Sequence, residues 1–239
     1  MRLLLPLAVL VAAAPAMAQD DLPPAPIPRL AAEAASPDGF VPRGWKLEVS
    51  KKGDLNGDKV PDVAMVLHGQ NPKLVLRDYP GQASETFDTN PRILAVAFGK
   101  PGGGYRLALQ NATLIPRRDN PSMDDPFEGG LEIARGVLRV KIYLFMSAGG
   151  WTTFNADYAF RWQNGRFELI GYDRGEVHRG SGETTDISIN FSTGRMSVTK
   201  GSIESDTPGK PVWSTYRGKR PVTIEMIGNG LDWQPWNAR

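Results

Sequence analysis

Apolar and polar residues alternate along most of the chain, in short runs that end at Gly, Asn or Pro. The clearest example is residues 155–174, NADYAFRWQNGRFELIGYDR, in which alternating runs stand on both sides of Asn164-Gly165. A period of two is typical of a strand with one buried face, and Asn-Gly is favoured in two-residue hairpin turns. The pattern therefore predicts a β-hairpin in this segment.

Four further segments combine apolar runs with a central turn signal. They are residues 92–111, 130–146, 185–201 and 212–227, with the turn of the last placed at GKRP. Together with the first hairpin they predict about ten to twelve strands. We expect an all-β, mainly antiparallel fold, a meander of sequential hairpins that forms curved or blade-like sheets. The sequence has no repeat of fixed period, which argues against a full propeller.

Composition agrees with this fold class and limits the partners. The chain has 26 Gly and 20 Pro, and 41% of its residues are hydrophobic. Such a composition favours many turns between short buried segments. The formal net charge is only +2, which gives no electrostatic reason for binding to nucleic acid or to an anionic membrane surface. We therefore expect no nucleic-acid partner.

The first 18 residues have the pattern of a secretory signal peptide. Arg2 precedes an apolar run over residues 3–14, and Ala16 and Ala18 form an A-x-A-like cleavage signal. The run is too short to span a bilayer, although an uncleaved anchor is the alternative interpretation. The chain contains no cysteine, so neither a lipid-modified N-terminus nor a disulfide is available. We expect a periplasmic or secreted protein without an integral membrane segment after cleavage.

The region after the signal peptide differs from the rest of the chain. Residues 19–44 are rich in Pro, Ala and charge and show neither the helical nor the strand period. They predict a disordered tether, or a partly helical segment with a short helix around residues 29–35. Residues 45–239 then form a single β-rich domain, long enough to be stabilised by its own core.

One short segment, GDLNGDKVPD at residues 53–62, places oxygen-bearing side chains at close intervals. Asp54, Asn56, Asp58 and Asp62 supply side-chain oxygens, and Val60 supplies a backbone carbonyl at the position expected of a calcium loop. A hard cation such as Ca²⁺ needs six to eight oxygen ligands, so the spacing predicts a structural calcium site. The alternative is a set of nested Asx-turns without a metal.

This loop resembles the calcium loop of FG-GAP repeats, the integrin-type β-propeller repeat. It does not resemble an EF-hand, because Met65 stands where the bidentate Glu would be and a strand pattern follows the loop. Lys59 occupies the position at which the family has Gly. The order of segments over about residues 45–200 is similar to uncharacterised exported bacterial proteins described as FG-GAP or VCBS-like. The resemblance implies an envelope location and a β-rich fold, and no reaction.

The sequence gives little indication of an enzyme. The two histidines, His68 and His178, have no partner that sequence can identify, and Ser181 lacks the strand-turn-helix context of a G-x-S-x-G nucleophile. Paired carboxylates could hydrolyse glycosides if two of them faced each other across a cleft. The available ones are Asp124, Asp125, Glu128, Asp157, Asp173 and Glu176. An exported hydrolase that acts on envelope glycan or another extracellular polymer is therefore the alternative function.

Tryptophans in turn-like surroundings favour a binding role. Trp151 follows SAGG, and Trp233 and Trp236 lie in the C-terminal segment GLDWQPWNAR. Exposed indole rings can stack on a sugar, a peptide or a partner protein, while packing against the sheet is the alternative. The sequence thus predicts a non-catalytic envelope module, stabilised by calcium, that binds a protein or glycan partner.

Overall fold

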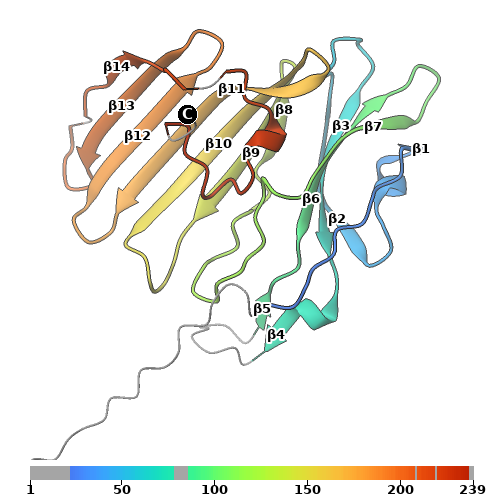
Figure 1. The fold of residues 1–239 in the computed structure, drawn as a ribbon, viewed down its shortest axis with the longest axis horizontal. Coiled ribbons are helices and arrows are strands. Elements are labelled where there is room, and N and C mark those ends of the chain that lie inside the picture. The colour runs from blue at the N-terminus through green and yellow to red at the C-terminus, as the bar shows by residue number, and fades with distance from the viewer. Residues whose placement is uncertain (1–21, 78–85, 208, 219, 237–239) are drawn as a thin grey trace, which may run out of the picture.

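Two antiparallel sheets make up most of the computed structural model, which describes residues 22–77, 86–207, 209–218 and 220–236 (Figure 1). The seven-stranded sheet contains β8 (Leu131–Ala134), β9 (Val137–Leu144), β10 (Thr152–Gln163), β11 (Arg166–His178), β12 (Glu183–Asn190), β13 (Arg195–Ser202) and β14 (Val212–Thr215). The five-stranded sheet contains β1 (Glu33–Ala34), β7 (Tyr105–Asn111), β6 (Arg92–Gly99), β3 (Asp62–Gly69) and β2 (Trp45–Gly53), in that spatial order. A small third sheet pairs β4 (Val75–Arg77) with β5 (Thr86–Asp88).

The seven-stranded sheet is a meander, because its spatial order from β8 to β14 is also its order in the sequence. The turn between β10 and β11 places Asn164 at φ 54° and Gly165 at φ 73°, the positive values that a type I′ turn requires. Hairpins also form where the sequence predicts them for β6–β7, β8–β9 and β12–β13. The prediction of an all-β, mainly antiparallel fold with curved sheets is confirmed.

The hairpin predicted over residues 212–227 does not form. Its first half is β14, which adds to the edge of β13. Its second half instead makes one bridge, from Thr223 to Glu168 on β11, and then enters the 3-10 helix η4 (Ile224–Met226). Val222, Ile224 and Ile227 of this half are buried in the core of the seven-stranded sheet, so tertiary packing decides the conformation of the segment.

The two central strands of the five-stranded sheet are buried on both faces, and their sequence explains why. Every residue of β3 and β6 is buried, and both strands are nearly continuous apolar runs. One face, with Ala64 and Val66, joins the core formed with the seven-stranded sheet. The other face, with Met65 and Leu67, forms a second core with the N-terminal segment.

The N-terminal segment is this second cover, where the sequence predicts a tether. From residue 22 to residue 44 the chain is extended, apart from the 3-10 helix η2 (Pro37–Phe40), and the short helix expected around residues 29–35 is absent from this described part. Leu30 and Phe40 are buried against the sheet. Two apolar anchors thus hold a Pro- and Ala-rich stretch whose pattern has no period. The predicted signal peptide lies outside the described residues.

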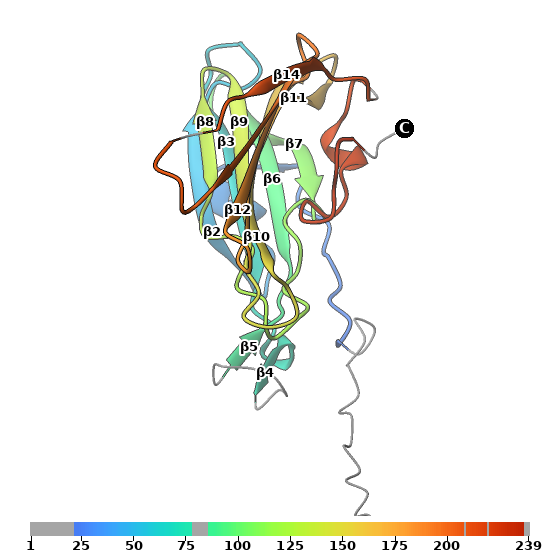
Figure 2. The ribbon, with the colours of Figure 1, turned by 90° about the vertical axis from the view of Figure 1, so that its left-hand side faces the viewer.

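The C-terminal segment covers one face of the seven-stranded sheet. Residues 216–236, red in Figures 1 and 2, lie to one side of this sheet and contribute Tyr216, Val222 and Ile224 to its core. The neighbouring β8 also packs against β2 and β3, which joins the two sheets. The opposite face of β10 to β13 carries none of these covers. Within the described part of the chain, no helix has the length and apolar content to cross a membrane.

We predict that Phe40→Ala lowers the free energy of unfolding by about 3–5 kcal/mol, because Phe40 is fully buried in the second core. Chemical denaturation monitored by tryptophan fluorescence measures the change. Ile27→Ala is the control: Ile27 lies in the same segment but is 40% exposed, so its loss costs about 0.5 kcal/mol or less. Equal effects of the two variants would mean that the segment is not packed on the sheet.

Candidate functional site

The acidic loop between β2 and β3 forms a set of Asx-type turns at the upper edge of the five-stranded sheet (Figure 1). Asp54 accepts hydrogen bonds from the backbone N–H groups of Gly57, at 2.7 Å, and Lys59, at 3.0 Å. Asp58 accepts one from Val60 N at 2.8 Å, and its own N–H donates to Asn56 Oδ1 at 3.0 Å. Lys59 adopts φ 68°, a left-handed conformation that glycine adopts without strain and other residues rarely do.

Asp62 has a different role from the other acidic residues of the loop. It is fully buried, and its carboxylate accepts hydrogen bonds from the N–H groups of Leu55, Asn56 and Gly99. Burial raises the pKa of Asp62, and the three donors oppose this shift. The carboxylate therefore joins the loop to the end of β6.

The predicted calcium ligands are only partly brought together. Their chemistry suits a hard cation, and each oxygen that accepts one backbone N–H has a second lone pair. However, among the described residues no group of three or more acidic or His side chains is arranged to hold a metal ion. Asp62 points into the protein, while Asp54, Asn56 and Asp58 are linked at the exposed end of the loop.

The predicted tryptophans do not form one site. Trp233 packs against Tyr158, Tyr172 and Phe191, with ring centroids 5.4–6.5 Å apart, so its ring belongs to the core. Trp151 is 68% exposed in the loop before β10, and Trp236 is 40% exposed near the C-terminus. Packing explains Trp233, whereas Trp151 and Trp236 remain available at the surface.

The two histidines occupy contrasting places. His178 Nδ1 is 2.9 Å from Ser181 Oγ, and Ser181 Oγ also lies 3.2 Å from Glu183 Oε2. In a hydrolytic triad the acid orients the histidine, whereas here Glu183 contacts the serine. All three residues belong to one exposed turn in which Ser181 N and Glu183 N also bond to these side chains. Local turn capping accounts for the arrangement.

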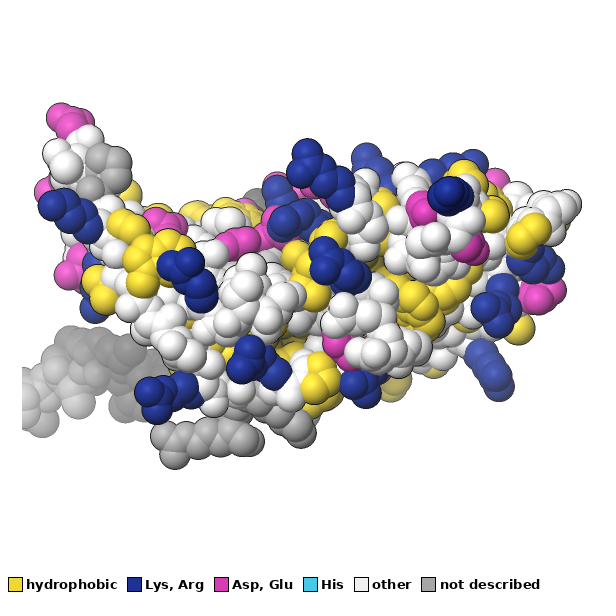
Figure 3. All heavy atoms as spheres, turned by 90° about the horizontal axis from the view of Figure 1, so that it is seen from above, with side chains coloured by type: hydrophobic (Ala, Val, Ile, Leu, Met, Phe, Trp, Pro, Cys, Tyr) yellow, Lys and Arg dark blue, Asp and Glu magenta, His cyan; other side chains and the backbone are white. Residues whose placement is uncertain are grey.

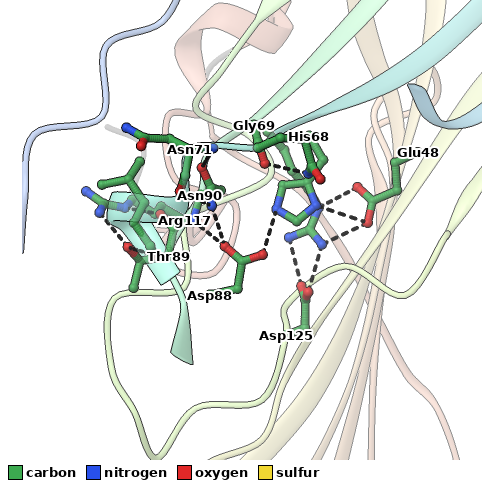
Figure 4. A network of polar contacts seen from close by, with 12 residues as sticks. Glu48, His68, Gly69, Asn71, Asp88, Thr89, Asn90, Arg117 and Asp125 are labelled. Carbon is green, nitrogen blue, oxygen red and sulfur yellow. Dashed lines mark hydrogen bonds and ion pairs between the residues drawn. The ribbon is translucent and has the colours of Figure 1, made fainter. Parts of the chain in front are cut away.

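His68 belongs to a polar network around the buried Arg92, at the other end of the five-stranded sheet (Figure 4). At its centre Arg92 donates to both oxygens of Glu48, at 2.7 and 2.9 Å, and to both oxygens of Asp125, at 2.8 and 2.7 Å. Burial opposes the charged form of Arg92, but these hydrogen bonds outweigh it and raise the pKa of Arg92. His68 lies 3.8 Å from Glu48 and 3.8 Å from Asp88.

The network joins segments that are distant in sequence. Glu48 lies on β2, Arg92 on β6, and Asp125 in the connection that leads to the seven-stranded sheet. Burial lowers the pKa of His68, and Arg92 adds to this effect, so the neutral imidazole is favoured. Because every nitrogen of the Arg92 guanidinium is already paired with a carboxylate, we interpret the network as a structural clamp.

Polar side chains gather on the uncovered face of the seven-stranded sheet. Cross-strand pairing places two rows of side chains on this face. The first row runs Lys141, Asp157, Asp173, Ser188, Ser197 and Trp213. The second row runs Tyr143, Asn155, Gly175, Asp186 and Thr199. We call these two rows the outer face.

A hollow of about 320 Å³ opens in the middle of the outer face. Gly175 has no side chain to fill it, and apart from Gly175 and Ile187 the residues that line it are polar or charged. They include Asn155, Asp173, Asp186, Ser188, Ser197 and Thr199. Trp213, at the end of the first row, is 57% exposed, and the Arg195 guanidinium lies 4.6 Å from its ring centroid. Hydroxyl, amide and carboxylate groups thus converge beside an exposed aromatic ring.

Sequence reasoning identified little of this surface. Asp157 and Asp173 were among the candidate carboxylates, and the structure places them directly opposite each other. Asp157 is paired with Arg139, at 3.3 Å, and with Lys141, at 3.8 Å. The sequence did not point to Trp213 and the remaining members, because only the register of six strands, β9 to β14, brings them together.

The upper end of the molecule does not show a comparable polar surface. Seen from above, Lys and Arg side chains are spread among acidic and apolar groups on this end (Figure 3).

No family model, curated protein or solved structure matches the chain. The resemblance to FG-GAP repeats therefore stays a prediction that depends on the acidic loop.

We predict that Arg92→Met lowers the free energy of unfolding by about 3 kcal/mol, because it leaves two carboxylates without their cation. The value is near the low end for buried pairs, since Asp125 is partly exposed. Urea denaturation at neutral pH measures it. Lys100→Met breaks the exposed pair with Glu33 and should cost less than about 1 kcal/mol. A loss for Arg92→Met as small as this control would contradict the clamp.

Proposed function

We propose that the protein is a non-catalytic module of the bacterial envelope, periplasmic or secreted, and that the outer face binds a glycan. The observation that supports this most directly is the polar hollow over Gly175. Its volume lies in the range typical of small-molecule sites, about 300–1,000 Å³. The face is free of the N-terminal and C-terminal covers that occupy the other sheet surfaces.

A glycan fits this face better than a protein partner. Centres of protein interfaces are depleted in Asp and Ser and enriched in large apolar side chains. The hollow has the reverse composition, with Asp173, Asp186, Ser188 and Ser197 around it. Sugars present hydroxyl groups that such side chains can pair with, and an exposed ring such as Trp213 can pack against a sugar face.

We further propose that the acidic loop takes up calcium with low affinity, as a structural ion. The support is the alternation of Asp54, Asn56 and Asp58 at the exposed end of the loop. Uptake would require these side chains to give up or share the Asx-turn hydrogen bonds. An affinity like that of extracellular modules, with a Kd of about 10⁻⁴–10⁻³ M, suits such an incomplete ligand set.

We predict that the purified protein binds one or more oligosaccharides in a panel of neutral and charged envelope-type glycans, and that Ser188→Tyr weakens the binding at least about tenfold. The added ring would cover the middle of the first row. Calorimetric titration measures the affinity. Thr193→Tyr, in the exposed turn between β12 and β13, is the control and should bind like the wild type.

Two results would contradict this function. Binding that Ser188→Tyr leaves unchanged would place the glycan elsewhere. Shorter fragments after incubation, detected by mass spectrometry, would favour the exported hydrolase.

For calcium, we predict that millimolar Ca²⁺ stabilises the protein by about 0.4–1.4 kcal/mol relative to excess EDTA, by mass action at the expected Kd. The thermal midpoint should rise by roughly 1–5 °C. Asp58→Ala should abolish the rise, whatever its midpoint in EDTA. If the wild type does not respond, or the variant responds equally, GDLNGDKVPD is a polar turn without a metal.

A further inference from the structure

The negative charge of the hollow is not balanced by the protein around it. Asp157 is neutralised by Arg139 and Lys141. In contrast, within the described part of the chain neither Asp173 nor Asp186 forms an ion pair or a side-chain hydrogen bond. They are diagonal neighbours across β11 and β12, roughly 7–8 Å apart at Cα. Arg174 also lines the hollow, but its guanidinium pairs with Glu176. The two carboxylates are exposed and face the same hollow without an ion-pair partner of their own.

The floor of the hollow brings further oxygens together. A Cβ atom on Gly175 would lie 3.1 Å from Asn155 Oδ1 and 3.1 Å from Asp186 Oδ1. These two acceptors therefore flank one small space from opposite strands. Carboxylate and amide oxygens that face each other this way suit a hydrogen-bond donor placed between them.

Ser197 gives independent evidence for a ligand. It is only 7% exposed and lines the hollow, beside the two aspartates and Thr199. Its hydroxyl has no hydrogen-bond partner among the described residues. The side chain is nearly buried while its Oγ opens into the hollow, so a ligand group there could pair with the hydroxyl in place of water.

From these contacts we infer that the hollow over Gly175 binds the ammonium group of an amino sugar, with Asp173, Asp186 and Asn155 as acceptors. An ammonium has three donors and a positive charge, which match the acceptors and the uncompensated negative charge. It also accepts looser geometry than a metal ion, and no described cluster meets the requirements of a metal. Ser188, Ser197 and Thr199 are placed to pair with the sugar hydroxyls.

This inference rests on the proposed glycan function and narrows it to sugars with a free amine. The test compares three tetrasaccharides, each built from a single sugar. The first contains four glucosamine units, the second four N-acetylglucosamine units and the third four glucose units. Calorimetric titration at slightly acidic pH, where the amine is protonated, should show binding of the glucosamine oligomer. The acetylated and neutral oligomers should bind at least about tenfold more weakly, because both lack the charge.

Two variants locate the effect in the hollow. Asp186→Asn removes one charge with almost no change in shape and should weaken glucosamine binding about tenfold. Gly175→Ala fills the space between Asn155 and Asp186 and should weaken it at least as much. Glu225→Gln, on η4 in the C-terminal cover, removes the same charge away from the outer face and should leave binding unchanged. Thermal midpoints of all variants check that they fold.

The outcomes separate this inference from the broader proposal. Equal binding of the three oligomers would overturn the ammonium site and leave the glycan-binding function standing. No binding of glucosamine, or full binding by Asp186→Asn, would likewise overturn it. A tetralysine peptide that binds as tightly as the glucosamine oligomer would show that the hollow recognises only positive charge. That result would overturn the assignment to a sugar.

Discussion

The fold depends on the need to cover both faces of β3 and β6. These two central strands are buried along their whole length, with apolar side chains on each side. A sheet of this kind is unstable in water unless a separate layer packs on each face. The seven-stranded sheet supplies one layer, and the N-terminal segment, anchored by Leu30 and Phe40, supplies the other. The described part of the chain is therefore arranged in three layers, with one core on each side of β3 and β6.

The seven-stranded sheet has the opposite property, because only one of its faces is needed for packing. Its core side holds Tyr158, Tyr172 and Ile189. Along each strand these apolar residues alternate with polar residues that point to the outer face. Selection for stability therefore leaves the outer face largely unconstrained. A binding surface can develop there without weakening the core.

Much of the fold follows from the sequence, because turns and alternation are local signals. Asn164-Gly165 specifies its hairpin by conformational preference alone. The N-terminal cover could not be predicted in this way, since Leu30 and Phe40 are ten residues apart in a stretch without a period. The turns around Asp54 and Asp58 follow from the local spacing of their side chains, but the inward direction of Asp62 depends on Gly99, which comes from another strand. The outer face combines residues from six strands, β9 to β14, so its composition depends on a strand register that no local pattern reveals.

Gly175 is the residue at which stability and binding make different demands. A glycine inside a long strand weakens it, because the residue loses more conformational entropy on folding and packs no side chain. The backbone φ of Gly175 is not in the left-handed region, so local conformation does not require glycine here. Nor does the core, since the position faces outward. A Cβ atom here would lie 3.1 Å from both Asn155 Oδ1 and Asp186 Oδ1, so the glycine lets these two side chains approach each other over the strand. The same absence of a side chain leaves the hollow open above the backbone, where the proposed ligand would bind.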